Sequence, residues 1–318
     1  TCKSRFCNSC GSKYIQDRAN SISSKLVNCT HRHIVFTIPK ELRYYFIRDR
    51  RLLHLLFEAS SKTVLSFFNN LNKSESFKPG IISTLHTFGR DLKWNPHIHM
   101  LVTEGASGNK TVFKVVPHIP FEMLRKRWQA ILLHLLHLSL GNSFYKLKTK
   151  LFKNYKDGFY VYAKSNLESK SSDSIEYIIR YTGRPAMAQS RILDYDGEFV
   201  TFFYDKHEDG SRVTEKIHAF DFIKRLIIHI PEHHFKMIRY YGFYAKKYPN
   251  SLLLQLLTTP AKMTFRKKYS HWRARILLAF GFDPLSCSCG HTMTLLALFN
   301  PGNNPYVDNL EPRLYNSS

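Results

Sequence analysis

The sequence predicts an α+β fold in which helices flank a central antiparallel sheet. Short runs rich in β-branched and aromatic residues alternate with longer runs whose apolar residues recur at helical spacing. Neighbouring strands are separated by short turns, which favours antiparallel pairing. The hydrophobic fraction of 43% is ample for a packed core, and this excludes an intrinsically disordered chain.

The N-terminal third supplies both kinds of element. Pro39 ends a β-branched and aromatic run, HIVFTIP, and apolar residues three and four positions apart follow it. In order along the chain we expect a helix to about Lys25, a strand at His33–Pro39, one or two long helices within Glu41–Asn70, and strands at Ile81–Phe88 and His97–Thr103 joined by a turn around Gly89–Pro96.

The rest of the chain continues this mixture and then becomes strongly basic. We expect strands at Thr111–Val116 and Gly158–Lys164, a helix at Pro120–Leu140, a short helix at Ile175–Tyr181, and a hairpin of Phe199–Tyr204 and Val213–Ala219 around the turn Glu208–Gly210. After Asp221 the pattern is mostly helical to about Phe280.

Charge is the most unusual property of the composition. Lysine and arginine number 47 against 24 aspartate and glutamate residues, which gives a formal net charge of +23. A folded protein this basic normally acts on a polyanion, and nucleic acid is the usual one; a generally basic protein without such a partner is the alternative. No stretch reaches the roughly 18 apolar residues of a membrane span. We expect neither a membrane nor a small-molecule substrate as partner.

The six cysteines are too few and too clustered for a disulfide framework. Cys2, Cys7 and Cys10 crowd the N-terminus, and this spacing in a basic chain without a signal peptide favours Zn²⁺. Because the chain begins at Thr1 rather than Met, we expect its natural start to lie upstream. The chain thus divides into a partial zinc-binding element with a linker helix at residues 1–29, the α+β domain at residues 30–220, and a basic, mainly helical region at residues 221–318.

The strand at His97–Thr103 carries a candidate metal site. Residues i and i+2 of a strand share a face, so His97 and His99 present two imidazoles side by side. About one such pair is expected by chance in a chain with 16 histidines, and two ordinary half-buried histidines explain the spacing equally well. His31 and His33 form a second pair, but the charged Arg32 between them suits a half-buried strand less well.

His86 is the candidate third ligand. It lies on the strand predicted to pair with the His97–His99 strand, and a turn centred near residues 91–92 sets it opposite about residue 97. A sheet histidine bonded to its neighbours is the alternative. Three protein ligands leave coordination positions open for substrate oxygen and water, as in catalytic metal sites.

Tyr177 and Tyr181 are candidate nucleophiles. Side chains four positions apart stack on one face of a helix, so both phenols address one point. A phenol with a pKa of about 10 is a poor nucleophile unless a metal polarises the phosphate that it attacks. The spacing is not specific, because Tyr240, Tyr244 and Tyr248 repeat it.

Five strings read together are far more specific than any single pair. They are CKSRFCNSCG, HIVFTIPKEL, LHTFGRDLKWNPHIHMLVTEG, EYIIRYTGRPAMAQSRI and FIKRLIIHIPEHHFKMIRYYGFYA. Over nearly the whole chain, this order resembles the two-tyrosine HUH transposases of bacterial insertion sequences, which move by a rolling-circle route and carry a zinc-ribbon-like N-terminus. The resemblance implies an HUH-type domain, an enzyme that cuts and transfers DNA strands, and a place in the bacterial cytoplasm at the nucleoid.

The resemblance also implies the role of individual residues. The HUH motif falls on His97-Ile98-His99 and the two tyrosines fall on Tyr177 and Tyr181, with Mg²⁺ or Mn²⁺ as the catalytic metal. One tyrosine would attack single-stranded DNA and leave a 5′-phosphotyrosine link. The cysteine knuckle falls on Cys2, Cys7 and Cys10, but the family's further cysteine pair upstream is missing. The family's C-terminal CxxC is one residue short at Cys287 and Cys289.

The basic residues complete the expected DNA contacts. Arg180, Arg184 and Arg191 follow the tyrosines closely and suit phosphates, although solvated surface charge explains them equally well. The C-terminal region interleaves cations with aromatic residues, the composition of a groove for single strands. Its main candidates are Arg239, Lys246, Lys247, Arg266, Lys267 and Lys268.

Two other functions fit part of this pattern. A non-catalytic, zinc-dependent DNA-binding protein, such as a decayed transposase, needs the charge and the cysteines but neither the histidines nor the tyrosines. A replication initiator or relaxase of the HUH type would use the same chemistry for another purpose. The zinc knuckle and the basic C-terminal region favour the transposase.

Overall fold

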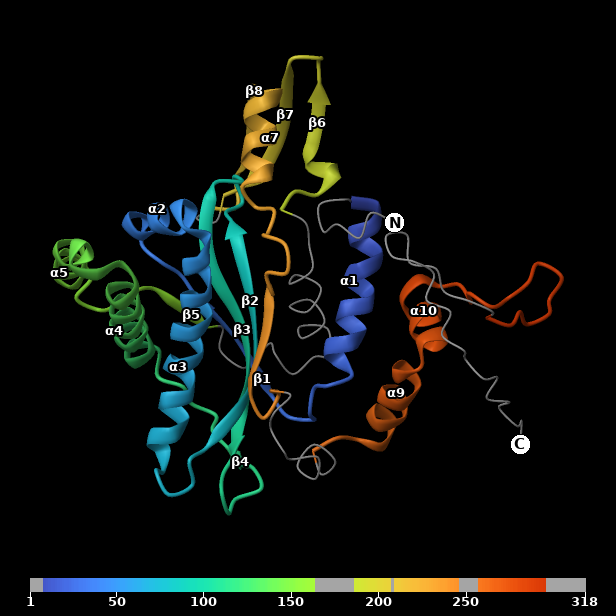
Figure 1. The fold of residues 1–318 in the computed structure, drawn as a ribbon, viewed down its shortest axis with the longest axis horizontal. Coiled ribbons are helices and arrows are strands. Elements are labelled where there is room, and N and C mark those ends of the chain that lie inside the picture. Colours follow the sequence, from blue (N-terminus) through green and yellow to red (C-terminus); the bar gives the residue numbers. More distant parts are fainter. Residues whose placement is uncertain (1–7, 164–185, 207–208, 246–256, 296–318) are drawn as a thin grey trace.

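The computed structural model describes residues 8–163, 186–206, 209–245 and 257–295, and its centre is an antiparallel sheet (Figure 1). The strands lie in the order β5-β1-β3-β2-β9, and β4 pairs with the end of β3. Their bounds are His31–Phe36 (β1), Lys78–Phe88 (β2), Trp94–Ser107 (β3), Lys114–Val115 (β4), Val161–Ala163 (β5) and Ile238–Gly242 (β9). The predicted α+β class with a central antiparallel sheet is confirmed.

One face of this sheet is covered by a layer of helices. These are α2 (Lys40–Arg48), α3 (Leu53–Leu71), α4 (Phe121–Leu140) and α5 (Tyr145–Asn154). Apolar side chains of α3 and α4 recur at helical spacing and pack against alternate residues of the strands, and together they form the main core. Trp128 on α4 is fully buried and donates its indole N–H to the carbonyl of Thr37 at 2.8 Å, so α4 is fixed to the end of β1.

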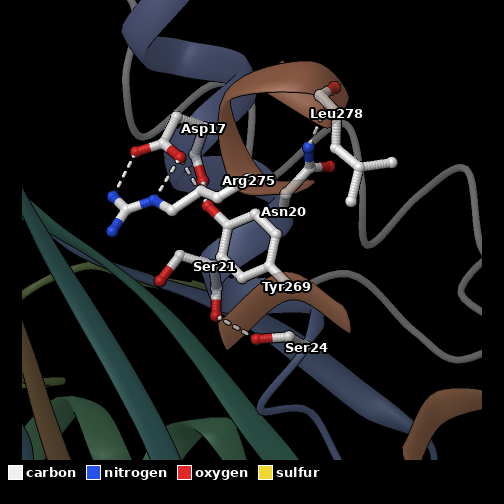
Figure 2. A network of polar contacts seen from close by, with 7 residues as sticks. All are labelled: Asp17, Asn20, Ser21, Ser24, Tyr269, Arg275 and Leu278. Atoms are coloured by element: carbon white, nitrogen blue, oxygen red, sulfur yellow. Dashed lines mark hydrogen bonds and ion pairs between the residues drawn. The ribbon is translucent and has the colours of Figure 1, made fainter. Parts of the chain in front are cut away.

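The opposite face of the sheet is covered in part by α1 (Asn8–Ser23). Ala19 and Ile22 pack against Ile82 and Leu101 of the sheet. On its outer side α1 meets the C-terminal helices α9 (Pro260–Ser270) and α10 (Trp272–Phe280) (Figure 1). Figure 2 shows the polar network that joins them, in which Asp17 of α1 accepts hydrogen bonds from side chains of both helices.

A second, three-stranded sheet stands at the end of the molecule where β2 turns into β3. It consists of β6 (Ile192–Tyr195), β7 (Phe199–Asp205) and β8 (Arg212–His218), followed by α7 (Ala219–Ile227). Phe202 and Phe222 pack against Leu92 of the β2–β3 turn, which joins this unit to the main sheet. The hairpin predicted for residues 199–219 is confirmed.

Several elements differ from the expectations. β9 lies in the stretch expected to be mostly helical, and it forms the edge of the main sheet beside β2. It ends at Gly242, whose φ of +58° favours glycine and where a Cβ would lie 1.6 Å from the Pro79 carbonyl oxygen. β4 and β5 are shorter than expected, and α5 and β6 were not expected. The expected helix at Ile175–Tyr181 lies outside the described residues.

The three expected regions stay predictions, although the main sheet extends past residue 220 through β9. Among the described helices, none is both long and apolar enough to cross a membrane.

Candidate metal centre and nucleic-acid surface

Two neighbouring strands carry the three predicted metal ligands. Successive side chains of a strand point to opposite faces, and on β3 Ile98 and Met100 enter the helical core. His97 and His99 therefore face the side on which α1 packs. β2 supplies His86, which pairs directly with His97. The pairing expected from the position of the turn is confirmed.

His86, His97 and His99 converge on one point. Each offers a ring nitrogen, and these atoms all lie within 4.8 Å of one another. The Nε2 atoms of His97 and His99 are 3.0 Å apart. Two nitrogens bound to one ion at about 2.1 Å and at a right angle are separated by about 3.0 Å. In the described parts of the chain this is the only such group of three potential ligands.

Burial favours the neutral form of His97 and His99, which is the form that binds metals. Desolvation lowers the pKa of His97, and desolvation together with the neighbouring imidazoles lowers the pKa of His99 well below its usual value. The Nδ1 of His97 lies 2.6 Å from the carbonyl oxygen of Asn95. A carbonyl can only accept, so Nδ1 carries the proton and Nε2 keeps its lone pair for a ligand.

His33 on β1 joins the cluster, which the sequence did not indicate. Its Nε2 lies 2.9 Å from Nδ1 of His99, and the two rings stack at 5.1 Å. Burial lowers the pKa of His33 to about 4. The charge of Arg32 made the His31–His33 pair a weaker candidate in the sequence, but Arg32 points to the other face and pairs with the buried Glu104 at 2.7 Å.

The predicted nucleophiles lie outside the described residues. Together with two of the predicted phosphate ligands they fall within residues 164–185, as Tyr177, Arg180, Tyr181 and Arg184. Before this segment, Ala163 ends β5 and pairs with Ile34 of β1, the strand beside β3. After it, Ala186 packs against Leu92 in the turn between His86 and His97. The described residues on both sides thus lie close to the strands that carry the histidines.

The other predicted DNA contacts are distributed over several elements. Arg191 is half-buried at the start of the second sheet, and three cations on α9 are exposed, Arg266, Lys267 and Lys268. Arg239 lies on the helical face of the sheet, away from the histidines, with its guanidinium 4.4 Å from the ring centroid of Phe57. Lys246 and Lys247 lie outside the described residues.

The two cysteine clusters differ in what the structure describes. Cys2 and Cys7 lie outside the described residues, and Cys10 lies in the first turn of α1. Cys287 and Cys289 occupy a tight turn in which the Cys287 N–H bonds to the His291 carbonyl. Within the described chain no third ligand joins this pair.

Comparison with known proteins gives two family matches and two relatives. Residues 80–251, more than half of the chain, match the family described as "Putative transposase", and residues 1–38 match the "Transposase zinc-binding domain". The transposase of insertion sequence element IS801 from Pseudomonas savastanoi pv. phaseolicola is 29% identical, over 93% of this chain and 75% of its own length. "Putative transposase y4qJ" of Sinorhizobium fredii is 25% identical, over 80% and 68% respectively. No solved structure matches the chain significantly.

Proposed function

Because the chain belongs to the transposase family of IS91 and IS801, we propose that it nicks and rejoins single-stranded DNA through a 5′-phosphotyrosine intermediate and so moves an insertion sequence by a rolling-circle route. The family consists of enzymes that cut and transfer DNA strands. The observation that carries the finer proposal is the convergence of His86, His97 and His99 on one point of the sheet.

The histidine cluster suits a divalent metal by its chemistry. Three neutral imidazoles supply three nitrogen lone pairs and no charge, a donor set that suits Mn²⁺ better than Mg²⁺, which prefers oxygen ligands. Such an ion would polarise the scissile phosphate and stabilise the oxygen that leaves it. Asn95 and His33 hold the rings of His97 and His99 by hydrogen bonds to their Nδ1 atoms, which directs the Nε2 atoms toward the shared point.

Tyr177 and Tyr181 are the nucleophiles in this proposal. The phenol oxygen of one attacks the phosphorus and loses its proton to solvent, while the bond from phosphorus to the 3′ oxygen breaks and that oxygen takes up a proton. The phosphotyrosine keeps the energy of the phosphodiester, so the 3′ hydroxyl of another strand reverses the step without ATP. A second tyrosine lets the enzyme take a second strand while the first is still bound.

Chain length supports the reach of these tyrosines. Tyr181 lies five positions before Ala186 (186 − 181), which packs against the turn between the histidine strands. Five extended residues span at most about 17 Å. In this proposal Tyr181 approaches the histidines across this short length of chain, and a helical i, i+4 spacing would bring Tyr177 to the same side.

The basic residues and the cysteines have supporting roles in the proposal. Arg180, Arg184 and Arg191 neutralise phosphates near the tyrosines, and Cys2, Cys7 and Cys10 contribute ligands to a Zn²⁺ site of the zinc-binding domain. The residues at 30–220 carry the chemistry, and the region after residue 220 adds DNA contacts. Both named relatives come from bacteria, so the protein acts on DNA at the bacterial nucleoid.

The test is a covalent adduct on a denaturing gel. The protein is incubated with labelled single-stranded oligonucleotides and Mn²⁺ or Mg²⁺, and the Tyr177→Phe/Tyr181→Phe variant should form no adduct while it still binds DNA. Tyr→Phe removes only the hydroxyl, so the packing of the ring is kept. Tyr145→Phe, at an exposed tyrosine of α5 on the opposite side of the sheet, should leave the adduct in place. An adduct in the double variant refutes the nucleophile assignment, and its absence in the wild type on every single strand favours a non-catalytic DNA-binding protein.

A further inference from the structure

A groove runs between α1 and the segment 230–240, at the edge of the main sheet. Arg18 and Ser21 line it from α1, and His233, His234, Lys236 and Tyr240 line it from the segment 230–240. Ile238 and Tyr240 pack with α1 on the sheet face that carries the histidines. The groove therefore opens on the same side of the sheet as the candidate metal centre.

The strand register places this groove next to the metal centre. Ile238 of β9 pairs with Thr84 of β2, and Thr84 pairs in turn with His99. One residue further along, the Leu85 N–H donates to the carbonyl of Met237 at 3.0 Å. The Ile238 end of the groove thus lies two strands away from His99 in the register, on the same face of the sheet.

Cationic side chains line the groove on both of its sides. Glu232 is the one carboxylate in its lining, and within the described residues neither Arg18 nor Lys236 forms an ion pair. Tyr240, which lines the groove, has the Lys25 ammonium 5.1 Å from its ring centroid. Cations that converge on a groove from two elements raise the local concentration of an anionic ligand.

We propose that this groove binds the sugar–phosphate backbone of the single strand next to the phosphate that is cut, with Arg18 and Lys236 as the principal phosphate contacts. The inference rests on the proposed function, and it adds the path of the substrate. A flexible single strand can follow a groove bounded by a helix and a loop, and cations along such a track neutralise successive phosphates. In this proposal the DNA single strand leaves the metal centre beside His86 and passes between helix α1 and strand β9.

The test measures the salt dependence of binding to a labelled single-stranded oligonucleotide by fluorescence anisotropy. Each phosphate contact contributes about 0.7 to the slope of log affinity against log salt for a single strand. Arg18→Gln with Lys236→Gln removes both charges and keeps a polar, unbranched side chain at each position, so the slope should fall by about 1.4. The matched control is Lys150→Gln with Lys153→Gln on α5, on the opposite side of the sheet, where both lysines are exposed; its slope should not change.

The outcomes separate this inference from the proposed function. A slope that is unchanged in the groove variant, or that falls equally in the α5 variant, overturns the groove. Lys236→Glu alone, at an exposed position, should weaken binding more than Lys236→Gln, and equal binding by the two also counts against it. The proposed function fails instead if the wild-type protein binds the single-stranded oligonucleotide with a salt-dependent affinity but never forms the covalent adduct. A wild type that binds no single strand refutes both.

Discussion

At the scale of single residues, the candidate metal centre is a chain of hydrogen-bonded imidazoles. The Nδ1–H of His97 must donate to Asn95, so the close contact between the two Nε2 atoms requires that His99 donates to His97. The Nδ1 of His99 is then an acceptor, and His33 donates to it through Nε2. If His97 and His99 held a cation through their Nε2 atoms, the proton of His99 would lie on Nδ1, and His33 would accept it in a hydrogen bond instead of donating one. The contact with His33 would then orient His99 with and without a cation.

This contact makes His33 testable as a positioning residue. His33→Ala removes the hydrogen bond to His99 and should weaken binding of Co²⁺ or Mn²⁺ about 10–100-fold, the usual effect of losing such an outer partner. His33→Gln places an amide near the position of Nε2 and should restore most of the affinity. The measurements are isothermal titration calorimetry and the visible absorption of bound Co²⁺, without DNA. If the affinity and the Co²⁺ spectrum of His33→Ala equal those of the wild type, His33 has no such role.

Single residues also decide how much of the candidate metal centre could be predicted from the sequence. The His97–His99 pair and the facing His86 follow from the alternation of a strand and the centre of one turn, which are local properties. His33 could not be found in this way, because its place beside His99 depends on the pairing of β1 with β3 across a long stretch of chain. The charge of Arg32 misled the argument because its partner Glu104 is 72 residues away in the sequence.

At the scale of elements, helix α1 near the N-terminus is held by side-chain hydrogen bonds to the C-terminal helices α9 and α10. Burial alone would raise the pKa of Asp17, but hydrogen bonds from Arg275 and Tyr269 lower it below its usual value. The Tyr269 hydroxyl lies 2.6 Å and the Arg275 Nε lies 2.7 Å from the same carboxylate oxygen (Figure 2). These bonds hold α1 between the sheet and the C-terminal helices, so they also fix one wall of the proposed groove.

Removing one of these bonds should loosen α1. Tyr269→Phe deletes a buried hydroxyl that donates to a carboxylate, and we expect the free energy of unfolding to fall by about 1–3 kcal/mol. The measurement is urea denaturation followed by circular dichroism. Tyr145→Phe is the control, because Tyr145 is 61% exposed, and its effect should lie within about 0.5 kcal/mol. An equal effect of the two substitutions would contradict the role of the Asp17 network.

The elements that sequence reasoning missed share a physical cause. β9 has only five residues and lies in a basic stretch, and it is a strand because it completes the edge of β2 rather than because of its own pattern. The longer strands β2 and β3 were found because their β-branched and apolar runs are bounded by a clear turn. Two-residue β4 is likewise defined by its partner β3.

At the scale of the whole molecule, the excess of positive charge is divided between surfaces of different kinds. Arg239 packs on Phe57 in the helical layer, so part of the basic C-terminal region supports the fold rather than DNA. Helix α9, which carries exposed cations, lies beyond α1 as seen from the sheet (Figure 1). A DNA single strand that follows the groove could therefore continue toward a second basic surface, the exposed side of α9.

The two surfaces should contribute independently to DNA binding. Arg266→Gln, Lys267→Gln and Lys268→Gln together remove three exposed charges from α9, and if each contacts one phosphate the salt slope for single-stranded DNA should fall by about 2. When these substitutions are combined with Arg18→Gln and Lys236→Gln, the decrease in the salt slope should be close to the sum of the two separate decreases, because groups on separate elements without shared partners act additively.

The oligonucleotide must be long enough to reach both surfaces. On a short oligonucleotide that covers only the groove, the α9 variant should have the same salt slope as the wild type. An α9 effect that is equally large on the short strand would mean that α9 acts at the groove itself, and no effect on either strand would remove α9 from the DNA surface.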